Sequence, residues 1–269
     1  MNFLEQTITS FVNAMERALY AEELAKAHGL LQRLDPRIKL VGILGLIVAA
    51  AMARKLWVIG AVFAIALMLA AASRVSLWVL AKRVWIPVLL FTGIIALPAP
   101  FLIPGRAVGR LPGLGWPITS AGLASAEYLV TRVETAATLS VLLILCTPWN
   151  HVLKALRVLR VPVVLVVILG MTYRYIFLLL ASAHDILESR RSRMVGKLPG
   201  TEGRRLATAC VGVLISKTLQ LSGDVYSAMV SRGFRGEVNL LDEFKTVPID
   251  WVALAAFVAL ASGAFYYGR

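Results

Sequence analysis

The chain has 269 residues, of which 59% are hydrophobic and only 16% charged, and its mean hydropathy is +0.77. This apolar content exceeds what a soluble domain can bury, so the sequence predicts an integral membrane protein. The formal net charge of +13 is better explained by anionic lipid and by the positive-inside bias than by nucleic acid, because the basic residues lie between apolar runs without interleaved aromatic residues. No nucleic-acid partner is expected.

Residues 1–34 are expected to form an N-terminal amphipathic segment, with a surface helix of mixed charge from about Ser10 to Ala27. Glu5 and Glu16 lie near the start, and no basic region followed by an apolar core is visible, so no cleavable signal peptide is expected. The pair Asp35-Pro36 then reads as an N-cap and a first helical residue.

Residues 35–147 are expected to hold four membrane-spanning helices. A straight helix from Ile38 to Ala72 would measure about 50 Å, against a hydrocarbon core of roughly 30 Å, so this run must fold as a hairpin that turns at Arg54 and Lys55. The third and fourth spans and a last one within residues 248–269 are expected at about Val84–Leu102, Ala121–Cys146 and Trp251–Tyr267. A loop rich in Gly and Pro separates the third span from the fourth. The predicted fold is therefore all-α and polytopic, with about five transmembrane helices.

Basic residues in short loops orient these spans. The residues expected on the cytoplasmic side are Arg33, Arg37 and Lys39 before the first span, and Arg74, Lys82 and Arg83 between the second and third. The N-terminus and residues 148–247 are then also cytoplasmic, and the predicted location is the inner membrane of a bacterial cell.

Residues 148–247 are expected to form a cytoplasmic helical region. Thr147 reads as the N-cap of a short interfacial helix that begins at Pro148. Two long helices follow, at about Pro162–Arg193 and Arg204–Arg232, joined by a Gly- and Pro-containing turn. One alternative stays open, because residues 161–180 are apolar enough to cross the membrane, although Arg174 interrupts them.

Arg193 and Arg232 are the main candidate site residues, because each lies where a long helix should end and is followed by a glycine, Gly196 or Gly233. Glycine adopts the left-handed conformation that ends helices, and the helix dipole favours a cation there. A single such arginine is readily explained by the positive-inside bias alone. A matched pair up to roughly 40 Å apart is too wide for one small-molecule pocket and suits two equivalent sites on a two-fold symmetric partner.

Other chemistry is weakly supported. The three histidines are isolated, the acidic residues do not pair at ligand spacing, and no phosphate-binding G-x-x-x-x-G-K-[ST] loop occurs, so neither a metal site nor a cofactor is expected. Cys146 and Cys210 lie in apolar surroundings. For the charges of the fourth span, Glu127, Arg132 and Glu134, pairing with one another or with the backbone is favoured over a substrate route.

Several motifs in order resemble the transmembrane coupling subunit of energy-coupling-factor transporters, the CbiQ/EcfT family. They are Leu34-Asp-Pro-Arg-Ile-Lys-Leu40, Leu145-Cys-Thr-Pro148 with the basic helix that leads to Val161-Pro162, Arg174, and the two arginine motifs. The resemblance covers about Leu31–Gly236 and is closer to the CbiQ branch, which serves cobalt and sometimes nickel uptake.

This resemblance implies a non-catalytic subunit that joins a pair of cytoplasmic ABC ATPases to a membrane-embedded substrate-capture subunit, CbiM-like and with or without a small CbiN-like subunit. Each arginine motif would end a coupling helix and dock in a groove of one ATPase. The residues carried over are Ser192, Arg193, Ser231, Arg232 and Gly233, with Arg190, Arg191 and Arg235 as auxiliary candidates. Met194 departs from the usual small-Arg-small pattern, which is why Arg190 or Arg191 could share the first role.

There are three alternatives to a cobalt coupling subunit. A coupling subunit for nickel or for a vitamin fits the same motifs, since cargo selectivity lies in another subunit. An interfacial membrane enzyme would need clustered acids or a nucleophile with a base, and Asp185, Glu188 and Asp224 are too scattered. A self-sufficient secondary transporter would show repeated halves, and none is visible.

Overall fold

The computed structural model describes residues 29–104, 107–110, 117–193, 200–234 and 248–269. Its contacts divide the chain into two compact units. We call Leu24–Ala155 with Phe244–Arg269 the membrane unit, and Met1–Glu23 with Leu156–Glu243 the long-helix unit. The four-part division expected from the sequence, at residues 1–34, 35–147, 148–247 and 248–269, stays a prediction.

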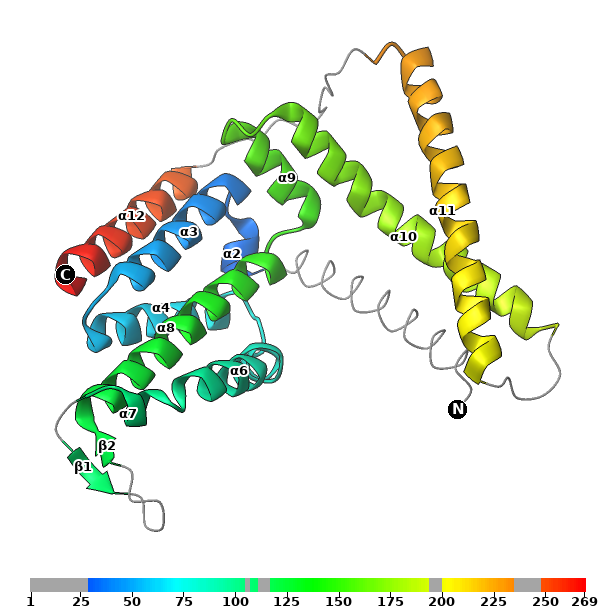
Figure 1. The fold of residues 1–269 in the computed structure, drawn as a ribbon. Coiled ribbons are helices and arrows are strands. Elements are labelled where there is room, and N and C mark those ends of the chain that lie inside the picture. Colours follow the sequence, from blue (N-terminus) through cyan, green and yellow to red (C-terminus); the bar gives the residue numbers. More distant parts are fainter. Residues whose placement is uncertain (1–28, 105–106, 111–116, 194–199, 235–247) are drawn as a thin grey trace. The chain divides into compact units, whose positions relative to one another are not determined.

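The membrane unit is built from helices of unequal length (Figure 1). In chain order its elements are α2 (Leu30–Arg33), α3 (Pro36–Met52), α4 (Leu56–Ala72), α5 (Leu77–Leu80), a π-helical turn (Ala81–Trp85), α6 (Ile86–Ala96), α7 (Ala99–Leu102), α8 (Ser120–Leu145), α9 (Trp149–Val158), whose last turn from Leu156 belongs to the long-helix unit, and α12 (Pro248–Gly268). Two short antiparallel strands, β1 (Ala107–Arg110) and β2 (Pro117–Thr119), lie in the loop before α8.

Local sequence signals account for most of these helix boundaries. The Asp35 carboxylate accepts a hydrogen bond from the Arg37 amide at 2.9 Å, and Pro36 is the first residue of α3, which confirms the predicted cap. The chain turns between Met52 and Leu56, so the predicted hairpin at Arg54 and Lys55 is confirmed.

Two boundaries differ from expectation. The third helical rod begins at Leu77 and not at about Val84, so it includes Lys82 and Arg83. A helix can contain these residues because long basic side chains extend along it while their charged ends stay in a polar environment. The N-cap of α9 is shifted by one residue: the Pro148 carbonyl accepts from the His151 amide at 2.9 Å, while the Thr147 hydroxyl is buried and has no hydrogen-bond partner within the described part of the chain. The expected side-chain cap at Thr147 was therefore wrong.

The core of the membrane unit lies between α3, α4, α8 and α12. Ile43 and Leu46 of α3 are buried with Leu139 and Leu142 of α8. Figure 1 shows α3 (blue) running beside α12 (red), and Phe257 of α12 sits over Gly42 so closely that an added Cβ would lie 2.5 Å from its ring. Small residues thus let these two helices approach, as they do in membrane helix pairs.

Within the described part of the chain, four helical rods are long and apolar enough to cross a membrane: Leu77–Leu102, Ser120–Leu145, Val163–Ser189 and Pro248–Gly268. Leu56–Ala72 is a shorter apolar helix. An all-α polytopic membrane protein is therefore confirmed, with the small β1–β2 hairpin as an addition to it. Because Val163–Ser189 is among the four, both placements considered for residues 161–180 remain open.

The long-helix unit consists mainly of α10 (Val163–Arg191) and α11 (Gly200–Ser231), which confirms the two predicted long helices. The C-terminal part of α10 packs against the N-terminal part of α11, where Leu187 and Cys210 are buried against Leu206 and Leu214. Beside this contact, Lys217 Nζ of α11 donates a hydrogen bond to Ser182 Oγ of α10 at 2.9 Å.

Candidate functional site

The end of α11 is a fully formed helix cap that carries Arg232. The Phe234 amide donates to the Met229 carbonyl at 3.0 Å and the Gly233 amide to the Val230 carbonyl at 2.9 Å, the two bonds of a Schellman motif. Gly233 has φ +78°, in the left-handed region, as the sequence analysis expected. The cap leaves the Arg232 side chain exposed at the end of the helix, where the helix dipole favours its charge.

The end of α10 carries Arg193 in a similar way. The Ser192 amide donates to the Glu188 carbonyl at 3.0 Å, and Arg193 follows in an exposed turn. Both motif serines bond to their own helix: Ser192 Oγ donates to the Ser189 carbonyl and Ser231 Oγ to the Ser227 carbonyl, each at 2.9 Å. These serines therefore support the last helical turn and leave the arginines free of the serine side chains.

Other members of the motifs lie wholly or partly outside the description. Met194, Gly196 and Arg235 are outside the described residues, so the predicted glycine end of α10 stays a prediction. Arg190 and Arg191 belong to the last turn of α10, where the structure describes the backbone only.

The two arginines lie at opposite ends of α11. Arg193 precedes the connection that enters α11, Arg232 follows its last residue, and the 32 residues between Gly200 and Ser231 make a helix about 48 Å long. This length is too great for both guanidinium groups to hold one small molecule.

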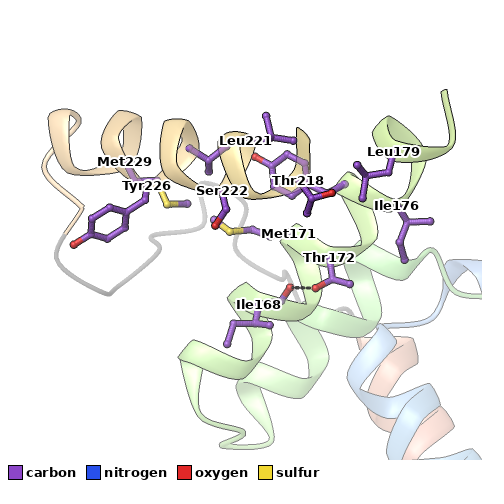
Figure 2. A pocket seen from close by; sticks show the side chains of 12 residues that line it. Ile168, Met171, Thr172, Ile176, Leu179, Thr218, Leu221, Ser222, Tyr226 and Met229 are labelled. Atoms are coloured by element: carbon purple, nitrogen blue, oxygen red, sulfur yellow. Dashed lines mark hydrogen bonds between the residues drawn. The ribbon is translucent and has the colours of Figure 1, made fainter. Parts of the chain in front are cut away.

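A groove runs between α10 and α11 on the side of Arg232 (Figure 2). It has a volume of about 460 Å³, and its walls include Ile168, Met171 and Ile176 of α10 and Leu221, Val225 and Met229 of α11. Figure 2 shows these walls as mainly aliphatic and thioether side chains, with Thr172, Thr218 and Ser222 among them. An apolar groove of this kind suits an apolar helix of a partner protein.

A second hollow of about 300 Å³ adjoins this groove and brings together two arginines far apart in the sequence. Arg174 of α10 and Arg232 both line it, with Met171, Tyr175 and Val225 shared with the larger groove. The sequence analysis treated Arg174 as an interruption of an apolar run and as one of the motifs that carry the resemblance, and it gave this arginine no site role. Its position could have been suspected, because an ionisable residue alone in an apolar helix usually marks a functional region.

The charges within the fourth span behave differently from one another. Arg132 Nη2 donates to the Ala53 carbonyl at 2.7 Å, so the predicted backbone pairing is confirmed for this residue. Glu134 is 8% exposed, and neither carboxyl oxygen has a hydrogen-bond partner among the described residues. The expectation of pairing was wrong for Glu134.

The described residues offer little for chemistry at a metal or a nucleophile. No group of three or more His, Cys, Asp or Glu side chains lies within this part of the chain where it could hold a metal ion. Burial raises the pKa of the Cys210 thiol above its ordinary value, so this thiol stays protonated near neutral pH and is a poor nucleophile. The exposed arginines and the groove are therefore the features best suited to function, and both suit binding.

Known proteins share much of this sequence. Residues 28–241, most of the chain, match the family described as CbiQ, cobalt transport protein. The chain belongs to the CbiQ family. It is 35% identical over 261 residues to an uncharacterized protein of Methanocaldococcus jannaschii, which covers 94% of this chain and 89% of that protein. It is 28% identical over 160 residues to the cobalt transport protein CbiQ of Rhodobacter capsulatus, covering 58% of this chain and 64% of that protein.

Membership of the CbiQ family confirms the resemblance drawn from the motifs. Together with the apolar helices it establishes a membrane component of cobalt transport. The matched region includes α10, α11 and both arginine motifs.

Proposed function

We propose that this CbiQ-family protein is the non-catalytic coupling subunit of an energy-coupling-factor importer, with cobalt as its favoured cargo. It transmits motion from two cytoplasmic ABC ATPases to a substrate-capture subunit in the membrane. The observation that carries the proposal is the pair of exposed arginines that end α10 and α11, separated by about the length of α11.

We assign each arginine to a binding groove on one of the two ATPases. A guanidinium group stays charged, makes several directional hydrogen bonds and enters a carboxylate-lined groove at a lower desolvation cost than an ammonium group. Ser192 and Ser231 support the last helical turns, and Gly233 closes the second one. Arg190, Arg191 and Arg235 are near the two arginine motifs in the sequence and are auxiliary candidates for the same contacts.

The groove between α10 and α11 is assigned to the capture subunit. Its apolar walls are exposed in the isolated chain, including Ile168 at 53% and Ile176 at 47%, and a membrane-embedded partner can cover them with an apolar helix. Because Met229 and Arg232 are three residues apart on α11, the capture-subunit contact and the ATPase contact share one rigid helix. A tilt of α11 that an ATPase imposes at Arg232 then changes the shape of the groove directly.

Coupling requires that the ATPases hold the two arginines differently before and after ATP hydrolysis. A ligand or partner shifts a conformational equilibrium only by its difference in affinity for the two states. The cargo is released inward when the capture subunit follows the moving helices. The proposed location is the cell membrane, with the N-terminus and the long-helix unit exposed to the cytoplasm.

Purification of the tagged chain from membranes of its own host tests this role. We expect two ATPase polypeptides and a capture subunit to co-purify in fixed ratio with it, as measured by native mass spectrometry. An interfacial enzyme or a secondary transporter would purify alone, and that result would contradict the proposed function.

A further inference from the structure

A buried ionic cluster in the membrane unit is the strongest feature that the proposed function does not use. Lys39, in the first turns of α3, is only 1% exposed, and its Nζ donates a hydrogen bond to the Cys146 carbonyl at 3.2 Å. Cys146 directly follows the last residue of α8. The ammonium therefore lies at the C-terminal end of α8, where the helix dipole favours positive charge.

Two carboxylates complete this cluster. Asp35 and Asp250 are 7% and 3% exposed, and both lie close enough to Lys39 to attract its ammonium group. Asp250, in the first turn of α12, also accepts a hydrogen bond from the Asp35 amide at 2.9 Å on Oδ1. The Lys39 cluster, defined as Lys39, Asp35, Asp250 and the Cys146 carbonyl, thus joins the start of α3, the start of α12 and the end of α8.

Stability alone is a poor reason for such a cluster. Burying charges costs desolvation energy, and well-packed apolar residues of similar volume often stabilise a protein as well or better. What a buried ionic cluster adds is a fixed relative arrangement of the helices, because its hydrogen bonds are satisfied in that arrangement only. The Lys39 cluster therefore suits a place where three helix ends must keep one geometry.

The chain passes between the two units at three places, each within twelve residues of a member of the Lys39 cluster along the sequence. The crossings lie between Glu23 and Leu24, between Ala155 and Leu156, and between Glu243 and Phe244. Asp35 is reached soon after the first crossing, Cys146 lies shortly before the second, and Asp250 comes shortly after the third. Every covalent connection to the long-helix unit thus joins the membrane unit close, along the chain, to a member of the Lys39 cluster.

We propose that the Lys39 cluster is the anchor through which the membrane unit receives motion from the long-helix unit. It holds the start of α3, the start of α12 and the end of α8 together, so that a displacement carried along α9 and along the start of α12 moves the membrane unit as one body. Without the Lys39 cluster, α9 would deform locally and the displacement would not reach the rest of the membrane unit. This inference rests on the coupling role proposed above, and Lys39 acts in it as a positioning residue.

The test uses the complete transporter, reconstituted with its ATPases and capture subunit. In Lys39→Met the apolar stem is kept and the charge and hydrogen bond are removed. We expect at least a tenfold loss of cobalt taken up per ATP hydrolysed, while the recovery of assembled complex and its ATP hydrolysis change by less than about threefold. We also expect the amide hydrogens of α9 to exchange at least tenfold faster with deuterium.

Arg132→Met is the matched control. Arg132 also donates to a backbone carbonyl, that of Ala53, but Ala53 follows the other end of α3, about 21 Å along the helix from Lys39. This variant should leave both the uptake ratio and α9 exchange within about twofold of the unsubstituted protein. If Lys39→Met and Arg132→Met change the two readouts equally, the cluster has only a general structural role and the proposal is overturned.

A second variant covers the case in which Lys39→Met does not assemble. Asp250→Asn keeps the oxygen that accepts from the Asp35 amide and removes only the charge, and it should show the same two changes at reduced size. Unchanged α9 exchange and an unchanged uptake ratio in Asp250→Asn would overturn the proposal. The exchange readout needs no ATPase, so faster α9 exchange would support the anchor even if the ATPases were found not to bind Arg193 and Arg232.

Discussion

Cobalt uptake should fall to background when Arg193 and Arg232 are both replaced by glutamate, and the two ATPases should no longer co-purify with the chain. Removing one partner from a desolvated, hydrogen-bonded charge pair costs about 2–5 kcal/mol, or roughly 30-fold to several thousand-fold in affinity. Reversal of the charge adds repulsion from the carboxylates expected in each ATPase groove. Each single variant should weaken the association and abolish transport, and the double variant should lose binding altogether.

A control for this result comes from the same unit. Arg205 is an exposed arginine in the second turn of α11 and belongs to neither arginine motif, so Arg205→Glu makes the same change in net charge as each single variant without replacing a motif residue. ATPase recovery with Arg205→Glu should stay within about threefold of the unsubstituted chain. Insertion into the membrane, followed by the amount of each variant in washed membranes, should be the same for all of them. Normal ATPase recovery and cobalt uptake in the double variant would refute the assignment of the two arginines.

Leu221→Arg should separate the capture subunit from the complex while the ATPases remain. Leu221 lines the groove between α10 and α11, and burying a leucine against a partner is worth about 1.5–3 kcal/mol, to which an unpaired buried charge adds a further cost. Recovery of the capture subunit should fall at least tenfold and that of the ATPases less than twofold. Quantitative mass spectrometry of the purified complex measures both.

Leu219→Arg is the matched control for the groove. Leu219 lies half a turn away on α11, is 70% exposed and does not line the groove. It should leave the capture subunit bound. Equal losses from the two substitutions would show that the capture subunit does not depend on this groove.

Much of the fold follows from elementary rules. The hairpin at Arg54 and Lys55 is required by the mismatch between helix length and bilayer thickness, and the start of α3 by the Asp35-Pro36 pair. The end of α11 follows from Gly233, because few other residues adopt a positive φ. These signals are local, and each needs only a few neighbouring residues.

The features that the sequence did not reveal depend on contacts between distant segments. Lys39 was read as a cytoplasmic loop cation, yet its burial depends on Cys146 and Asp250, which only folding brings near it. Arg174 joins Arg232 because α10 and α11 pack against each other at their other ends, through Leu187 and Cys210. Such pairings follow from tertiary packing and leave no periodic signal in the chain.

The most direct measurement of the central claim is photo-crosslinking in native membranes from positions 192 and 231, where an exposed serine adjoins each arginine. A photoreactive residue at either position should form an adduct with an ATPase polypeptide, whereas the same probe at position 205 should not. Adducts only with this chain itself, or labelling of either position from the outer face of the membrane, would contradict the coupling role.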